Sequence, residues 1–226
     1  MKDIYLFVRG PGVLISFIVF LVGTMYQIIW FFKNTKRYEC GGVPIFIPKQ
    51  ALENIGPSIE IKKLAKREGT AWSTDPFFVV ITSLFHFFVI ITPLFLLAHN
   101  LLLKESWSIS LPSFSEKLSD MCTLIILGFG IYFLYRRIFN RKVRSITSFS
   151  DYWTFILVFL PYLTGFLAYH QIFPYSYMVI LHIISGELMI MLIPFSKLRH
   201  LIFFFLNRIF IQSEYSFFKK GNRVWS

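Results

Sequence analysis

The sequence predicts an all-α integral membrane protein, a bundle of five transmembrane helices forming a single domain over residues 1–226. Three observations predict this fold class. Hydrophobic residues make up 55% of the chain and charged residues only 15%, whereas about a quarter of the residues of a soluble domain are charged. Five apolar runs are each long enough to cross the ~30 Å hydrocarbon core of a bilayer. Lys and Arg also alternate between loops in the way that sets membrane topology.

Each apolar run is expected to cross the membrane as a helix, because hydrocarbon offers no hydrogen-bond partner to unpaired backbone groups. The stretch before the first run is too short and too mixed in charge for a signal peptide, and no small-residue cleavage site follows it. The first run is therefore expected to be a retained helix. The second is long enough to tilt. The expected helices cover residues 12–32, 76–103, 120–135, 152–169 and 176–195.

The distribution of basic residues predicts an outer N-terminus and an inner C-terminus. The 23 Lys and Arg residues lie almost entirely in the predicted inner loop 33–75, the loop 136–144 and the cytoplasmic tail 197–226. The formal net charge of +11 is thus a topology signal. It does not indicate nucleic-acid binding, because a nucleic-acid surface would not alternate loop by loop. The four basic residues on the outer side are Lys2, Arg9, Lys104 and Lys117.

Motifs of several cofactor classes are missing from the sequence. The two cysteines, Cys40 and Cys122, form no C-x-x-C pair, which excludes a cysteine-ligated zinc or iron–sulfur site and covalent c-type haem. Both are expected to be free thiols. No Walker loop or G-x-G-x-x-G run is present, so nucleotide binding by either route is not expected.

Histidines inside the predicted spans are the strongest functional signal, since ionisable groups within a membrane are functional hypotheses by default. His86 and His99 lie in the second run, and His182 and His200 lie at the two ends of the fifth. On one continuous helix, His182 and His200 are five turns and roughly 27 Å apart on the same face. The second run crosses in the opposite direction, so His86 is expected level with His200 and His99 level with His182. Two histidine pairs at two depths predict two bis-histidine b haems.

Two further residues bear on this geometry. His86 and His99 are thirteen positions apart and do not share a face of an ideal helix. Pro93 between them is expected to bend the helix. Gly186 is expected to let a flat macrocycle lie against the fifth helix. The alternative is a set of histidines that only form hydrogen bonds between helices. A zinc or copper site is less favoured, because no carboxylate or thiol clusters with either pair.

Four runs of residues resemble a known family. The runs HIISGE at residues 182–187 and IPFSKLRH at residues 193–200 closely resemble the last transmembrane helix of the gamma-subunit family of respiratory nitrate reductases, five-helix dihaem cytochromes b. The runs PLFLLAHN at residues 93–100 and TGFLAYHQ at residues 164–171 resemble one branch more closely. That branch comprises the haem-b membrane subunits of transmembrane redox complexes of sulfate reducers. The resemblance covers most of the chain from the second span onward.

This resemblance implies that His86 and His200 ligate an inner haem and that His99 and His182 ligate an outer one. It also implies a cytoplasmic iron–sulfur partner similar to heterodisulfide reductase, other membrane subunits and a periplasmic multihaem cytochrome c. The nitrate reductase members have a shorter gap between the histidines of their second helix, so His170 remains an alternative to His99. Nitrate itself does not carry over, because a different subunit reduces it.

Other polar residues near the spans have two interpretations each. Glu187 is the carboxylate well inside a span, and it is either a proton-relay or quinone-pocket group or a neutral acid hydrogen-bonded to another helix. His170, Tyr169 and Lys104 are candidates for an outer quinone and proton site, and the alternative for His170 is a solvated loop histidine. Lys197 and Arg199 are expected either to contact haem propionates or to anchor the chain at the inner membrane surface.

The function predicted from the sequence is that of a membrane cytochrome b subunit of a quinone-linked respiratory complex in the cell inner membrane, used in anaerobic respiration. It would exchange electrons with menaquinone or another quinone and carry them across the membrane. Two alternatives remain open: a haem-free membrane anchor for redox subunits, and a proton- or ion-conducting subunit that uses Glu187 and the histidines. Both alternatives predict a colourless protein.

Overall fold

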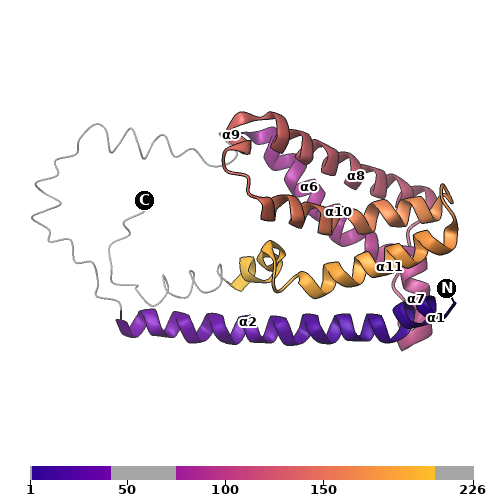
Figure 1. Cartoon of the computed structure of the whole chain (residues 1–226), viewed down its shortest axis with the longest axis horizontal. Helices are drawn as coiled ribbons and strands as arrows, with labels where there is room; N and C mark the ends of the chain where they lie inside the picture. Colours follow the sequence, from indigo (N-terminus) through magenta and orange to yellow (C-terminus); the bar gives the residue numbers. More distant parts are fainter. Residues whose placement is uncertain (1, 42–74, 207–226) are drawn as a thin grey trace, which may run out of the picture. The chain divides into compact units, whose positions relative to one another are not determined.

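The computed structural model describes residues 2–41 and 75–206, with side chains for residues 2–33 and 75–206. Over these ranges the chain is helical and contains no strand, which confirms the predicted all-α class for the described residues. The elements in chain order (Figure 1) are α1 (Lys2–Phe7), the π-helical turn η1 (Val8–Gly12), α2 (Val13–Gly41), α6 (Pro76–Phe95), α7 (Leu97–Trp107), α8 (Glu116–Phe139), α9 (Arg141–Arg144), α10 (Phe149–Tyr169), α11 (Tyr175–Leu192) and the 3-10 turn η2 (Lys197–Arg199).

Five helical segments among the described residues are long and apolar enough to cross a membrane, as the sequence predicts. The inside and outside assignment of their ends stays a prediction. Most of the predicted inner loop 33–75, and the predicted tail beyond residue 206, lie outside the described residues. The five segments are Lys2–Lys33, Pro76–Phe95, Glu116–Phe139, Phe149–Tyr169 and Tyr175–Leu192.

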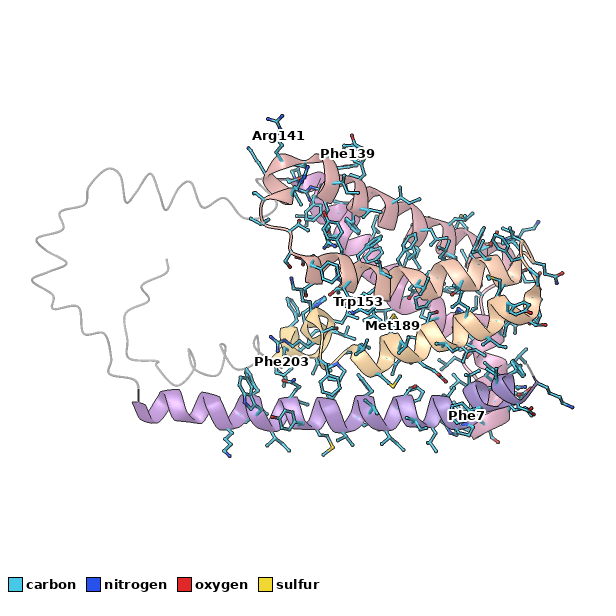
Figure 2. The ribbon with its side chains drawn as sticks, in the orientation of Figure 1. Phe7, Phe139, Arg141, Trp153, Met189 and Phe203 are labelled. Carbon is cyan, nitrogen blue, oxygen red and sulfur yellow. The ribbon has the colours of Figure 1, made fainter. Side chains whose placement is uncertain are left out.

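Large apolar side chains are exposed along all five segments. Examples are Ile18, Leu84, Ile131 and Leu188, and Figure 2 shows Phe139 extending from the end of α8. A soluble monomer rarely exposes apolar patches of more than a few hundred Å². These surfaces are suited to contact with lipid hydrocarbon.

The described helices group into two compact units. One contains the chain up to Ile29 together with the chain from Lys142 onward, and the other contains Trp30–Arg141. The first unit therefore holds α1, η1, the first part of α2, α10, α11 and η2. The second holds α6, α7 and α8. The single membrane domain of the sequence analysis stays a prediction.

In the second unit, α6 and α8 are joined by aromatic contacts and an ion pair. The ring of Phe133 on α8 meets the edges of Phe78 and Phe85 on α6, at centroid distances of 6.0 and 5.1 Å. Arg136 forms an ion pair of 2.9 Å with Asp75, whose carboxylate also accepts the backbone N–H of Phe78 as the N-cap of α6. This pair fixes the start of α6 against the end of α8.

The second predicted span, 76–103, is two helices. The helix α6 ends at Phe95, Leu96 is extended (φ −73°, ψ 128°), and α7 begins at Leu97. A break inside hydrocarbon requires that the released carbonyls find donors within the protein. Asn100, only 3% exposed, supplies one by donating from its side-chain amide to the Leu94 carbonyl at 3.2 Å.

In the first unit, α10 and α11 are neighbours along the chain and pack against each other. The buried hydroxyls of Thr164 and Ser185 lie 3.3 Å apart between the two helices. The fifth span ends earlier than predicted: α11 stops at Leu192, residues 193–196 form a turn, and residues 200–206 are helical again. Pro194 has no N–H to continue the helix. The expectation that one continuous helix carries both His182 and His200 is therefore wrong.

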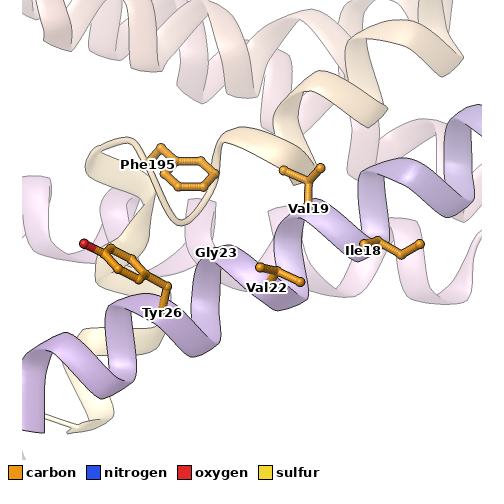
Figure 3. A pocket seen from close by; sticks show the side chains of 6 residues that line it. All are labelled: Ile18, Val19, Val22, Gly23, Tyr26 and Phe195. Carbon is orange, nitrogen blue, oxygen red and sulfur yellow. The ribbon is translucent and has the colours of Figure 1, made fainter.

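The first span is longer than predicted. It begins at Lys2, because the run Gly10-Pro11-Gly12 does not end the helix but is absorbed into the wider π-helical turn η1. Farther along α2, Gly23 faces the turn that follows α11. It lines an open apolar groove of about 370 Å³ together with Ile18, Val19, Val22, Tyr26 and Phe195, as Figure 3 shows.

Gly23→Ala is expected to lower the free energy of unfolding by about 1–3 kcal/mol through overpacking. A Cβ at Gly23 would lie 2.8 Å from Cγ of Pro194, and this buried, rigid ring cannot turn away. Gly128→Ala in α8 is the matched control, because a Cβ there meets nothing within 4 Å. Denaturant titration of the helical circular dichroism in detergent measures both variants. Equal stability losses would contradict the role given to the Gly23 contact.

Candidate functional site

The four predicted haem ligands lie on four different segments. His86 is on α6 and His99 on α7, both in the second unit, whereas His182 is on α11 and His200 directly follows η2 in the first unit. Each predicted pair thus takes one histidine from each unit. The pairing of His86 with His200, and of His99 with His182, stays a prediction.

All four imidazoles share one local arrangement, in which Nδ1 bonds to a backbone carbonyl. A carbonyl oxygen has no hydrogen, so Nδ1 must be the donor, and the lone pair of the neutral ring then lies on Nε2. Metal-ligating histidines are commonly oriented in this way. The acceptors are the carbonyls of Thr82 for His86 (2.7 Å), Pro93 for His99 (2.9 Å), Pro161 for His182 (2.9 Å) and Lys197 for His200 (2.7 Å).

The ring of His182 lies against α10 rather than along its own helix. A Cβ at Gly165 of α10 would be 2.9 Å from the ring Cε1 and 3.0 Å from Nδ1, so the ring needs a glycine there. The Pro161 carbonyl, one turn earlier on α10, accepts the Nδ1 hydrogen. By contrast, a Cβ at Gly186 would meet nothing within 4 Å. The face of α11 that the sequence analysis assigns to a macrocycle is thus open at this position.

The position of His99 depends on the break between α6 and α7. The break takes the Pro93 carbonyl out of regular helical bonding, and the His99 ring occupies it. The next residue, Asn100, holds the start of α7 to the following loop: it accepts from the Leu111 N–H at 3.3 Å and donates to the Ser113 hydroxyl at 3.1 Å. Sequence reasoning missed this anchoring role, for which the signal was an amide inside an apolar run, four residues after the extended Leu96.

His200 is held through the peptide group of Lys197, whose side chain is engaged elsewhere. The Lys197 ammonium donates to Oδ1 of Asp151 at 2.8 Å and to the hydroxyl of Ser148 at 3.2 Å. Ser148 and Asp151 form the capping box that begins α10. A haem propionate would have to displace or share this ion pair, whereas Arg199 is exposed. The S-x-x-D run was the sequence signal for this partner, and it was not used.

The predicted quinone and proton residues are divided between the units. His170 caps the end of α10, where its ring lies 4.3 Å from that of Phe166 and 5.1 Å, edge-on, from that of Tyr169. Lys104 lies in the last turn of α7 in the other unit. The structure therefore brings His170 and Tyr169 together, and the proximity of Lys104 stays a prediction.

Glu187 has an environment that the sequence did not indicate. Its Oε1 is buried without a hydrogen-bond partner among the described residues. The carboxyl group lies against the π-helical turn η1, where a Cβ at Gly12 would be 2.6 Å from Oε1. Neither predicted interpretation of Glu187, as a proton group or as a hydrogen-bonded structural acid, includes this contact.

A metal ion held by side chains alone usually needs three or more His, Cys, Asp or Glu ligands. Within residues 2–33 and 75–206, whose side chains the structure describes, no group of three or more His, Cys, Asp or Glu side chains is arranged to hold a metal ion. A bis-histidine haem requires only two protein ligands. Cys122 is buried and is a free thiol, as expected, and the side chain of Cys40 lies outside the described residues.

Comparison with known proteins gives one full-length relative. No family model matches the chain. The chain is 31% identical over 218 residues to a protein of Nitratidesulfovibrio vulgaris strain Hildenborough, and the match covers 96% of each chain. At this identity and coverage the two chains share one fold and a common origin. The chain belongs to the same protein family as this Nitratidesulfovibrio vulgaris protein.

Proposed function

We propose that the chain is the cytochrome b subunit of a membrane redox complex, which holds two b haems and exchanges electrons with a quinone. The observation that carries the proposal is the shared arrangement of His86, His99, His182 and His200. Each lies in or directly beside an apolar helical segment, and each bonds through Nδ1 to a backbone carbonyl. The same tautomer at all four positions supports the proposal, because iron would bind the Nε2 nitrogen of each ring.

The residues present fit a haem. The Nδ1 bonds orient all four rings and leave Nε2 as the basic nitrogen, which is the atom that would bind iron. Gly165 gives the His182 ring its position and Gly186 leaves the adjoining helix face open. When bound, two such haems would supply one-electron carriers at two depths of the membrane.

The ligand assignment follows the predicted pairs: His86 with His200 for the inner haem and His99 with His182 for the outer one. His170 is the alternative to His99. Its ring packs against Phe166 and Tyr169, and the His99 ring is oriented by the bond from its Nδ1 to the Pro93 carbonyl.

The proposed quinone site is at the outer end of α10. A quinone headgroup needs hydrogen-bonding groups beside apolar surface, and His170 and Tyr169 provide these next to Phe166. Lys104 is the third proposed member. In this scheme the side chains of His170, Tyr169 and Lys104 hold the headgroup and move its protons to or from the outer surface.

The proposed surroundings are the cell inner membrane and a cytoplasmic iron–sulfur subunit similar to heterodisulfide reductase. That subunit would dock on the basic inner surface, to which the exposed Arg141 of α9 belongs (Figure 2). Other membrane subunits and a periplasmic multihaem cytochrome c are further proposed partners. The rival functions, a haem-free anchor and a proton- or ion-conducting subunit, require a protein without visible absorbance.

The purified chain is expected to carry two b haems. Quantitation by the pyridine haemochrome method, with a reduced-minus-oxidised spectrum, should give two haems per chain. His182→Ala and His99→Ala should each remove the same haem and leave the other, because both rings are proposed to bind one iron. His170→Ala is the control and should keep both. A wild-type chain without haem would favour the rival functions. If His170→Ala loses one haem and His99→Ala keeps both, His170 is the ligand in place of His99.

Gly165→Val is expected to remove the haem bound by His182 while the helical content is retained. Its side chain would occupy the space of the His182 ring, which a Cβ already approaches to 2.9 Å. Gly186→Ala adds a methyl group four residues after His182, on open helix surface. It tests whether the helix face that is proposed to lie against the haem tolerates a side chain. Haem content and circular dichroism are measured in both. If Gly165→Val binds two haems as the wild type does, the observed ring position is not the ligating one.

His170→Ala and Lys104→Ala are expected to slow quinol-dependent haem reduction by about a hundredfold, the usual contribution of a positioned proton-transfer group. Haem content should not change, because neither residue is a proposed ligand. Stopped-flow reduction by a soluble menaquinol analogue gives the rate, and dithionite gives the total reducible haem in the same samples. Unchanged quinol rates in both variants would move the quinone site away from this end of α10.

A further inference from the structure

The Glu187 carboxyl group is the most unusual polar feature of the first unit. It lies on α11, a helix long and apolar enough to cross a membrane, and its buried Oε1 has no hydrogen-bond partner in the described part of the chain. Among the described residues Glu187 also takes part in no ion pair. An ionised carboxylate in that position would be costly in hydrocarbon, so the resting group is the neutral acid.

The element that faces Glu187 is also unusual. The turn η1 is a π-helix and contains Pro11, which has no N–H to donate to the carbonyls of the preceding turn. Such π-helical turns are rare and occur frequently at functional sites. Gly12 presents no side chain to the carboxyl group, and its own carbonyl accepts the hydroxyl of Ser16 at 2.8 Å.

A purely structural acid would be arranged differently. Buried polar groups in folded proteins are almost always hydrogen-bonded, and a carboxylic acid that serves to join two helices donates its proton to an acceptor on the other helix. Glu187 makes no such bond to the facing turn. Its proton is therefore held by the acid alone and is not locked into a contact between helices.

Other charged groups do not explain the position of Glu187. Arg9 is the basic residue of η1 and is exposed, and on α1 the charged residues Lys2 and Asp3 are exposed as well. On α11 itself, Tyr175 and Tyr177 are exposed. His182 lies five residues from Glu187, and its Nδ1 is bonded to the Pro161 carbonyl. No charged partner for Glu187 is thus found on its own helix or on the turn it faces.

We propose that Glu187 and the turn Val8–Gly12 form a proton-exchange site within the membrane, in which the Glu187 carboxyl group takes up a proton from water and returns it. The reaction is the reversible conversion of the acid and a water molecule into the carboxylate and a hydronium ion, with no other reactant. This site goes beyond the proposed electron-transfer function and does not require a bound haem.

The test is infrared spectroscopy of the full-length chain in lipid nanodiscs. The carbonyl stretch of a protonated carboxyl group is separate from that of a carboxylate, and the difference between wild type and Glu187→Gln isolates the band of this residue. We expect a band that shifts in D₂O and is lost as the pH is raised. A band that neither shifts nor titrates would identify a locked structural acid, and absence of the band at every pH would identify a permanent carboxylate. Either result overturns the proposal.

Two glycines of η1 give a matched pair that tests the role of the turn. A Cβ at Gly12 would lie 2.6 Å from Oε1 and 3.1 Å from Oε2, whereas a Cβ at Gly10 meets nothing within 4 Å. The flexible end of the Glu187 side chain can shift, so Gly12→Ala should fold. It should change the proton affinity of the group by about tenfold or more, and Gly10→Ala should not.

Equal bands in Gly12→Ala and the wild type would exclude η1 from the site and overturn the proposal as stated. Haem content, measured in the same preparations, reports on the electron-transfer proposal separately. A colourless chain with a titrating Glu187 band would contradict the cytochrome b proposal and support the proton site. A chain with two haems and no titrating band would do the reverse.

Discussion

The constraint on which the structure depends is that hydrocarbon cannot hydrogen-bond to a polypeptide backbone. Four interruptions or prolines occur inside the apolar segments of the described chain, and each is accompanied by a side chain or turn that accommodates it. The break after Pro93 is filled by the His99 ring and by Asn100. The carbonyl of Pro161, within α10, accepts from His182. The turn around Pro194 is followed directly by the bond from His200 to Lys197, and Pro11 lies in the π-helical turn beside Glu187. Three of the four candidate haem ligands, His99, His182 and His200, and the Glu187 carboxyl group are thus located beside a proline.

This coincidence has a physical reason. A proline or a helix break changes which backbone carbonyls are available, and an imidazole that binds such a carbonyl gains a fixed ring plane and a fixed tautomer at once. Without such a bond, the imidazole would lose its rotamer freedom only when it binds a ligand. This loss of entropy would lower its affinity for the ligand. His86 shows that a regular helix can do the same through the Thr82 carbonyl, one turn earlier. The interruptions allow side-chain orientations that a regular helix does not. An example is the His182 ring, which lies against Gly165 of the neighbouring helix.

The sequence predicted the number of spans and the all-α class because both follow from the hydropathy of long segments. It did not predict their ends, since Gly10-Pro11-Gly12 is a helix-breaking run that the protein absorbs as a π-helical turn, and Pro194 is compatible with either a kink or a stop. The candidate histidines were identifiable because ionisable residues are rare in apolar runs. Their hydrogen bonds were not all predictable: the His182 bond reaches a carbonyl twenty-one positions away on another helix, and the contact of Glu187 with Gly12 joins opposite ends of the chain. Such contacts depend on helix packing, which a single sequence does not reveal.

The early end of α11 changes how the inner and outer ligand positions are related. On one continuous helix, His182 and His200 would move together, and any tilt of α11 would displace both. In the structure the segment before His200 is held from two other helices. Pro194 is buried against Gly23 of α2, and the Lys197 ammonium is paired with Asp151 at the start of α10. An exposed ion pair contributes little stability by itself, but here it fixes the peptide group that orients the His200 ring. The position of His200 therefore depends on α2 and on the start of α10, and that of His182 depends on the middle of α10.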